Sequence, residues 1–305
     1  MRISLFFVCL LSFIYSNAQH LPVSSKNNFR IVFLGNSITY AGYFTAEIET
    51  YYRLKYPANK IEFINLGLPS ETVSGLSEEG HAQGNFPRPF LFDRFERTIN
   101  QTRPDLIISC YGMNDGIYLP LDTVRFKRFQ AGIQKLQQEA DRRSIELVHL
   151  TPPIYDPIKG EAYAHVLDVY TKWLLSQRKL NWKVIDIHNP MKQELHTRRN
   201  QDPTFIFAQD GIHPDEFGHW IIAKNILIGL GEIAIESSVS FEDFYQTYPN
   251  GEKIQLLIRN KQSLLKDAWL CGIGHQRPNM KQGLPLKEAI TQTDLMQNQI
   301  LELVE

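Results

Sequence analysis

The chain alternates between short apolar runs rich in β-forming residues and longer segments with a helical spacing of apolar residues. Continuous apolar runs are typical of strands buried on both faces, and their alternation with helices is typical of a parallel sheet covered by helices. The strand-like runs are FRIVFL (29–34), IEFINL (61–66), DLIISC (105–110), IELVHL (145–150) and KVIDIH (183–188). Helical patterns include residues 45–55, 124–143, 163–178 and 215–230, the last beginning after Pro214. The sequence therefore predicts an α/β fold.

The first 18 residues have the layout of a signal peptide. Arg2 is followed by an apolar run and then by the small residues Ser16-Asn17-Ala18, which suit cleavage after Ala18. The run is shorter than the about 20 apolar residues that a spanning helix needs. We therefore predict export to the periplasm or the medium, with an uncleaved N-terminal anchor as the alternative.

The C-terminal part of the chain has a different pattern from the rest. Beyond residue 235 no strand-like run remains, and residues 252–269 and 286–304 are spaced as helices around a Gly/Pro-bearing connector. We expect a main α/β domain over residues 19–235 and a helical hairpin within residues 236–305. The hairpin could cover the functional crevice, form a dimer surface or close the core, and the oligomeric state stays open.

Charge and cysteine content narrow the possible partners. The 32 Lys+Arg and 33 Asp+Glu give a formal net charge of −1, so no global field would hold nucleic acid or an anionic membrane. We predict no nucleic-acid partner and no integral membrane association. Beyond residue 18 the only cysteines are Cys110 and Cys271. We favour buried free thiols, with a disulfide as the alternative.

Small and polar residues directly follow three of the predicted strands. The first strand leads into Gly35-Asn36-Ser37-Ile38-Thr39, the second into Gly67, and the third into Tyr111-Gly112-Met113-Asn114-Asp115. The carboxyl ends of parallel strands in an open sheet share one crevice. We therefore expect Ser37, Gly67 and Asn114 to converge there.

A serine hydroxyl becomes a nucleophile only beside a base that is itself oriented by a third group. The turn Asp210-Gly211-Ile212-His213-Pro214 provides both, because an Asp three residues before a His can accept from one ring nitrogen. The other nitrogen then faces Ser37. The backbone N–H groups of Ser37 and Gly67 and the side-chain amide of Asn114 are candidate donors to a developing oxyanion.

Taken in order, GNSIT, Gly67, GMND and DGIH resemble the sequence blocks of the SGNH (GDSL-type) hydrolases, over roughly residues 29–231. The resemblance implies a flavodoxin-like three-layer α/β/α sandwich. It also implies that Ser37, Gly67, Asn114 and His213 are the four residues in the family name, with Asp210 as the triad acid. Asn36 replaces the usual Asp at a position that supports the loop. No G-x-S-x-G motif surrounds Ser37, which argues against the α/β-hydrolase fold.

Each of these residues also has a purely structural interpretation. Ser37 could cap a helix, and Asn114-Asp115-Gly116 or Asp210-Gly211 could form turns, with His213 an ordinary surface histidine. We interpret Asp115 as a turn residue only. The structural interpretations explain single residues but not the shared order of the four blocks.

The remaining histidines do not suggest a second kind of site. His149 and His188 end predicted strands, where packing is expected, and His81 lies in a Gly-containing stretch that could border the crevice. His275 could cap or brace the C-terminal connector, with a substrate contact as the alternative. The sequence has neither H-E-x-x-H nor clustered Cys/His spacing, so we predict no metal and no cofactor.

The resemblance includes carbohydrate O-acetylesterases, lipases, lysophospholipases and thioesterases, and a fold does not choose among them. Export, the lack of a visible lipid-binding helix and the polar stretch 70–88 favour a short acyl group, such as acetyl, on a glycan or small molecule. Four tyrosines could stack on sugar rings or simply pack: Tyr40, Tyr43, Tyr111 and Tyr118. The alternatives are a lipid acyl hydrolase, a non-catalytic glycan-binding relative, and an acyltransferase that uses the same acyl enzyme.

Overall fold

The computed structural model describes residues 28–304, so the predicted signal peptide lies outside the described residues. Five strands form one sheet in the order β2-β1-β3-β4-β5, and every neighbouring pair is parallel. The strands are β1 (Phe29–Gly35), β2 (Ile61–Gly67), β3 (Leu106–Cys110), β4 (Glu146–Leu150) and β5 (Lys183–Ile185). The predicted parallel sheet is confirmed.

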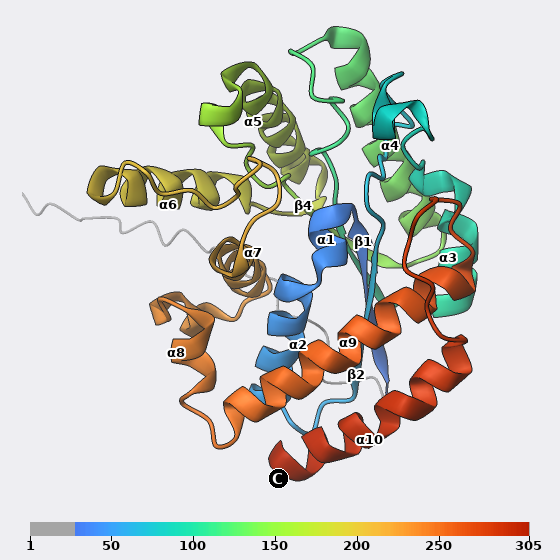
Figure 1. The fold of residues 1–305 in the computed structure, drawn as a ribbon, viewed down its shortest axis with the longest axis vertical. Coiled ribbons are helices and arrows are strands. Elements are labelled where there is room, and N and C mark those ends of the chain that lie inside the picture. Colours follow the sequence, from blue (N-terminus) through green and yellow to red (C-terminus); the bar gives the residue numbers. More distant parts are fainter. Residues whose placement is uncertain (1–27, 305) are drawn as a thin grey trace, which may run out of the picture.

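Helices cover both faces of this sheet (Figure 1). The connection from β1 to β2 and the connections from β2 through β5 run in opposite directions along the sheet. Because parallel crossovers are right-handed, α2 lies on one face and α3, α4 and α5 lie on the other. The helices are α1 (Ser37–Ala41), α2 (Tyr43–Lys55), α3 (Phe95–Thr102), α4 (Thr123–Arg142), α5 (Glu161–Ser176), α6 (His188–Gln201), α7 (Glu216–Gly229), α8 (Phe241–Tyr245), α9 (Gly251–Ile273) and α10 (Leu286–Val304). The predicted three-layer α/β/α sandwich is confirmed.

The core lies between the sheet and its two helical layers. Strands β1 and β3 supply fully buried aliphatic side chains to both faces, including Ile31, Val32 and Ile107. Phe129 of α4 stacks on Tyr170 of α5, with ring centroids 4.2 Å apart. Because helices cover both faces of the sheet, the strand-forming runs do not alternate regularly between apolar and polar residues.

The fifth strand is shorter than the apolar run that predicts it. The run continues to residue 188, whereas β5 ends at Ile185. The hydroxyl oxygen of Thr151 accepts hydrogen bonds from the N–H groups of both Ile187 and His188, each at 2.9 Å, and draws the chain off the sheet. His188 is buried at the start of α6 and donates or accepts only within the protein, consistent with its predicted packing role.

The C-terminal helices form the predicted hairpin. Helix α9 packs against α2 and β2, and α10 packs back along α9 (orange to red in Figure 1). Ile254 and Ile258 are fully buried in this interface. Buried polar contacts add to it, because Lys261 donates to the Glu49 carboxylate of α2. The hairpin is therefore packed on the same side of the sheet as α2.

Neither cysteine is bridged, as predicted. Cys110 is buried at the end of β3 and Cys271 is partly exposed on α9, and both are free thiols. Burial raises the pKa of the Cys110 thiol to about 12. Within residues 28–304, no helix is both long and apolar enough to cross a bilayer.

His149 on β4 is a fully buried histidine held in one tautomer. Its Nε2–H donates to Gln137 Oε1 at 3.1 Å, so Nδ1 accepts from the hydroxyl of Ser109 at 3.0 Å. The ring also stacks on Trp182. Burial lowers the pKa of His149 to about 3. The predicted packing role of this residue is confirmed.

We predict that His149 makes the fold sensitive to acid. The unfolded chain binds a proton near the ordinary histidine pKa of about 6.5, whereas the folded chain resists protonation, so stability falls as pH drops below about 6.5. Relative to wild type, His149→Gln should remove up to about 1.4 kcal/mol of this loss per pH unit. Urea unfolding between pH 7 and pH 4 measures the difference. Parallel pH profiles for the two proteins would contradict it.

Candidate active site

The proposed nucleophile lies on a short helix packed against the ends of two strands. Gly35 of β1 pairs with Gly67 of β2, and α1 begins two residues after Gly35. A Cβ on Gly67 would come within 2.2 Å of the backbone nitrogen of Tyr40. The helix is capped by Asn36, whose side chain accepts from the Ile38 N–H at 3.1 Å. Ser37 is therefore the first helical residue, and the capping role belongs to its neighbour.

Ser37, His213 and Asp210 form a continuous hydrogen-bonded chain. His213 Nδ1 lies 2.6 Å from Asp210 Oδ2, and His213 Nε2 lies 2.8 Å from Ser37 Oγ. A carboxylate can only accept, so it fixes the Nδ1–H tautomer and leaves Nε2 to accept from the serine hydroxyl. Ser37 and His213 are 176 residues apart in sequence, and the fold brings them together in the predicted arrangement.

The turn that carries His213 is built around the second oxygen of Asp210. This oxygen accepts from the N–H groups of Ile212 and His213, each at 2.9 Å. Partial burial acts to raise the pKa of Asp210, but these hydrogen bonds outweigh it and hold the pKa below its usual value. The carboxylate therefore stays ionised to lower pH than an ordinary aspartate and can orient the imidazole.

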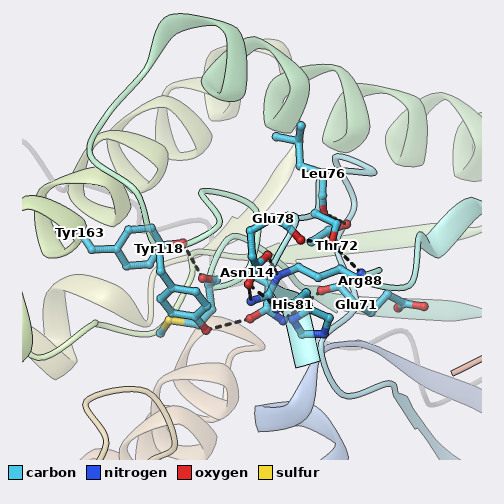
Figure 2. Close-up of polar contacts among 11 residues, drawn as sticks. Glu71, Thr72, Leu76, Glu78, His81, Arg88, Asn114, Tyr118 and Tyr163 are labelled. Carbon is cyan, nitrogen blue, oxygen red and sulfur yellow. Dashed lines mark hydrogen bonds and ion pairs between the residues drawn. The ribbon is translucent and has the colours of Figure 1, made fainter. Parts of the chain in front are cut away.

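Asn114 lies in the turn after β3, next to β1 in the sheet. The strand order makes the space between β1 and β3 the point where chain direction along the sheet reverses, which is where ligands bind in flavodoxin-like folds. Asn114 Nδ2 donates to the Glu71 carbonyl at 3.1 Å, and its Oδ1 accepts from the Tyr118 hydroxyl at 2.9 Å (Figure 2). An amide nitrogen carries two hydrogens. One is therefore left to meet an oxyanion.

Gly67 has a different environment from the one we expected of an oxyanion donor. Its N–H donates to Asn65 Oδ1 at 2.9 Å, so it would have to leave that oxygen to reach a substrate. Its lack of a side chain is explained by the close approach of α1. Three residues later, Ser70 adopts a left-handed backbone with φ of 68°. Among residues 28–304 the Ser70 N–H has no acceptor, and it directly precedes Glu71, which holds Asn114.

The GDSL-like Lipase/Acylhydrolase family model matches residues 33–221, which include all five predicted site residues. This is more than half of the chain. The chain belongs to this family. It is therefore a serine hydrolase that acts on ester bonds. No curated protein sequence matches the chain.

Solved structures support the fold of this acylhydrolase. The acetylxylan esterase Axe2 from Geobacillus stearothermophilus is 20% identical, with a TM-score of 0.53 over 67% of this chain and 94% of Axe2. An α/β hydrolase enzyme from the metagenome of Lake Arreo, Spain, is 21% identical, with a TM-score of 0.53 over 67% and 95%. A gut microbial diltiazem-metabolizing enzyme is 23% identical, with a TM-score of 0.53 over 70% of this chain. The match spans only about half (49%) of that last protein.

The acylhydrolase fixes its crevice loops with buried charges that the sequence did not single out. Glu71 is fully buried and forms a two-pronged ion pair with Arg94, at 2.6 and 2.7 Å, and also accepts from the Tyr111 hydroxyl at 2.6 Å. These contacts hold the backbone whose carbonyl orients Asn114. Glu71 carried no recognisable signal, because a glutamate within a polar stretch is ordinarily a surface residue.

Asp115 is more than the turn residue that we expected. It is fully buried, and its carboxylate accepts from the N–H groups of Val73, Ser74 and Gly112 at 2.8 to 2.9 Å. Burial raises its pKa, although these hydrogen bonds oppose the shift. Asp115 thus ties the loop after β2 to the loop after β3, which is the pair of loops that flank Asn114.

The stretch that contains His81 packs against Tyr118, whose hydroxyl donates to Asn114. Arg88 forms a two-pronged ion pair with Glu78, both contacts at 2.6 Å, and its guanidinium lies over the Tyr118 ring at 5.3 Å (Figure 2). His81 Nδ1 lies 3.4 Å from the same glutamate. Arg88 therefore contacts Tyr118, the side chain that donates to the Asn114 oxygen.

The four tyrosines proposed as sugar platforms differ in accessibility. Tyr111 is buried and its hydroxyl donates to Glu71, so its ring cannot stack on a sugar and the proposal that it does is wrong. Tyr118 has its hydroxyl on Asn114 and one ring face under Arg88. Tyr40 and Tyr43 each lie under a cation of α9. The predicted residues therefore belong mainly to the packing around the site.

We predict that Asn114→Ala lowers kcat by about 10²–10³-fold with little change in KM, because one oxyanion donor is removed. Tyr118→Phe is the matched control. It keeps the amide donor and removes only the hydrogen bond that positions it, so its loss should be clearly smaller. Steady-state kinetics with p-nitrophenyl acetate compares the two variants. Wild-type kcat in Asn114→Ala would rule out the amide as a donor.

Proposed function

We propose that this chain hydrolyses carboxylic esters through an acyl enzyme on Ser37. The observation that carries the proposal is the unbroken chain of hydrogen bonds from Ser37 Oγ through His213 to Asp210, at 2.8 and 2.6 Å. As Ser37 Oγ attacks the acyl carbon, its proton passes to His213 Nε2. His213 then gives this proton to the leaving alcohol. Water attacks the acyl enzyme with the same histidine as base, which releases the acid and restores Ser37.

Negative charge on the substrate oxygen needs donors that are already in place. We assign this role to the Ser37 N–H and to the second amide hydrogen of Asn114. The N–H of Ser70 is a further candidate, because it has no acceptor among residues 28–304 and adjoins the carbonyl that holds Asn114. In this scheme Gly67 acts by allowing α1 to approach the sheet.

The substrate that we propose is a short acyl group, such as acetyl, on a carbohydrate. Half of the surface of the His213 and Asp210 side chains is exposed, so a bulky alcohol can approach the triad. A cavity of about 310 Å³ beside them is lined by polar and apolar side chains, Gln209 and Asp215 as well as Ile206 and Phe207. The fold shared with an acetylxylan esterase is consistent with this substrate.

We also infer that the enzyme acts outside the cytoplasm after cleavage following Ala18. The inference is based on the signal-like residues 1–18 alone. Mass spectrometry of protein from the natural source should find a chain that begins at Gln19. An intact N-terminus would favour the anchored alternative.

We predict that Ser37→Ala abolishes ester turnover and leaves the fold intact. A fluorophosphonate probe should label wild type at Ser37 and fail to label the variant, because only an activated serine reacts. Circular dichroism of the purified variant is the control for folding. Hydrolysis of p-nitrophenyl acetate at the wild-type rate by the folded variant would refute the mechanism. A failure of wild type to label would favour a glycan-binding role.

We predict a steep preference for short acyl groups. The kcat/KM for p-nitrophenyl esters should be highest for acetate and should fall as the chain lengthens, and acetylated polysaccharide should release acetate. A preference for long chains would instead support a lipid acyl hydrolase. Adding a sugar acceptor to the acetate assay tests the transferase alternative, which requires an acetylated sugar as product.

A further inference from the structure

A second cavity opens beside the nucleophile helix, at its junction with the C-terminal hairpin. It has a volume of about 200 Å³ and lies between the α1–α2 turn and α9. Residues from the turn line one wall, including Ala41, Gly42 and Tyr43. Residues of α9 line the other. The hairpin therefore contributes directly to the surface around the active site.

The α9 wall presents two cations toward this cavity. Arg259, Ser263 and Lys266 recur at intervals of four and three residues, so they share one face of the helix. Arg259 lies over the ring of Tyr43 at 4.7 Å, and Lys266 lies over the ring of Tyr40 at 4.1 Å. Among residues 28–304, no aspartate or glutamate lines the cavity.

Lys266 is a half-buried ammonium without a carboxylate partner. Its Nζ donates to the Tyr40 carbonyl at 3.1 Å, and no carboxylate in the described part of the chain lies within ion-pair distance of it. The neighbouring Asp267 instead accepts from the Tyr40 hydroxyl at 2.8 Å and faces Lys281 at 3.5 Å. Burial lowers the pKa of Lys266, although Asp267 opposes the shift. An ammonium in this position has unoccupied N–H donors.

Arg259 is only partly neutralised. One terminal nitrogen of its guanidinium lies 2.7 Å from the carboxylate of Glu216, whose side chain is exposed. Glu47 lies nearby, but burial raises its pKa well above the usual range and favours its neutral form. A guanidinium has five N–H donors, so Arg259 keeps donors for a second partner. The exposed side chains of Asn260 and Ser263 add neutral donors on the same helix.

The cavity wall begins about one turn of α1 away from Ser37. Ser37 begins α1 and Ala41 ends it, so the helix rises about 6 Å from the nucleophile to the cavity wall. This separation is comparable to the length of one sugar unit. A ligand whose ester lies at Ser37 can thus extend along α1 to the cations.

We propose that this cavity is a subsite for the carboxylate of an acidic sugar, so that the preferred substrates are acyl esters of uronate-containing glycans. The choice of substrate rests on the proposed ester hydrolysis, whereas binding of the uronate does not. Arginine and lysine both form charge-assisted hydrogen bonds to a carboxylate, and those bonds are the stronger kind. The overall charge of −1 means that this preference comes from the local pair of cations.

Binding is tested in the full-length Ser37→Ala variant, which should not turn substrate over. Sodium D-glucuronate should bind measurably by calorimetry and D-glucose much more weakly, with the difference shrinking as salt is raised. Adding Lys266→Met should weaken glucuronate binding by about tenfold or more. Adding Lys253→Met is the matched control, because Lys253 is an exposed lysine on the same helix and its loss changes the net charge equally. Equal binding of the two sugars, or an equal effect of both lysine variants, would overturn the proposal.

Specificity is tested with two acetyl esters that differ only at carbon 6, an acetylated methyl glucuronide and the matching methyl glucoside. The ratio of their kcat/KM values should favour the acid in wild type and in Lys253→Met. It should fall about tenfold or more in Lys266→Met and recover partly in Lys266→Arg. If Lys266→Met fails to fold, Arg259→Met tests the subsite independently, because it should also lower the ratio. An unchanged ratio in the folded variants would refute the subsite.

The two proposals fail in different ways. If wild type hydrolyses neither ester while Ser37→Ala binds glucuronate in a Lys266-dependent manner, the hydrolytic function is wrong and the subsite stands. If both esters are hydrolysed at equal rates and glucuronate does not bind, the subsite is wrong and the hydrolytic function stands.

Discussion

The strand order β2-β1-β3-β4-β5 is the constraint on which the site depends. The chain moves one way along the sheet from β1 to β2 and the other way from β2 through β5, so the loops after β1 and β3 lie on either side of the reversal point. Ser37 and Asn114 are carried by these two loops. His213 reaches them from a turn far along the chain, because α7 packs beside α2 and brings its preceding turn to the same end of the sheet.

The topology brings the loops around Asn114 close together, and buried charged side chains hold these loops in place. The Glu71–Arg94 pair and the Asp115 carboxylate are removed from water, and each is matched by hydrogen bonds that hold loop backbone in place. Isolated buried charges would be costly, but paired ones confine their partners to one geometry. Asn114 benefits from both, since Glu71 holds its nitrogen and Asp115 ties down the loop on either side. A preorganised donor of this kind acts without rearranging when charge develops.

The sequence predicts the sheet, the sandwich and the three residues of the hydrogen-bonded triad because each rests on a short-range pattern. Apolar runs identify strands, and DGIH places its acid and base within one turn. Helix α6 escaped prediction because few of its side chains are buried, Met191 and Leu195 among them, which leaves too little periodic signal. The role of Asp115 could not be predicted because two of its three partners, Val73 and Ser74, lie in another loop. Its complete burial is also not visible in the sequence. The hydrogen bond from the Gly67 N–H to Asn65 could not be predicted for a similar reason, because it forms only once the strand end is folded. The place of Gly67 in the oxyanion hole stays a prediction.

The C-terminal hairpin adds a surface beside the active site that the residues matched by the family model do not form. The family model ends at residue 221, yet α9 contacts the nucleophile helix through Asp267 and Lys266, which bind the hydroxyl and the carbonyl of Tyr40. A change in α9 therefore alters the wall beside Ser37 without touching the triad or the loop that holds Asn114. Because catalysis and this wall reside on separately packed elements, an added helix can change which alcohol is accepted while the chemistry of the shared core stays the same.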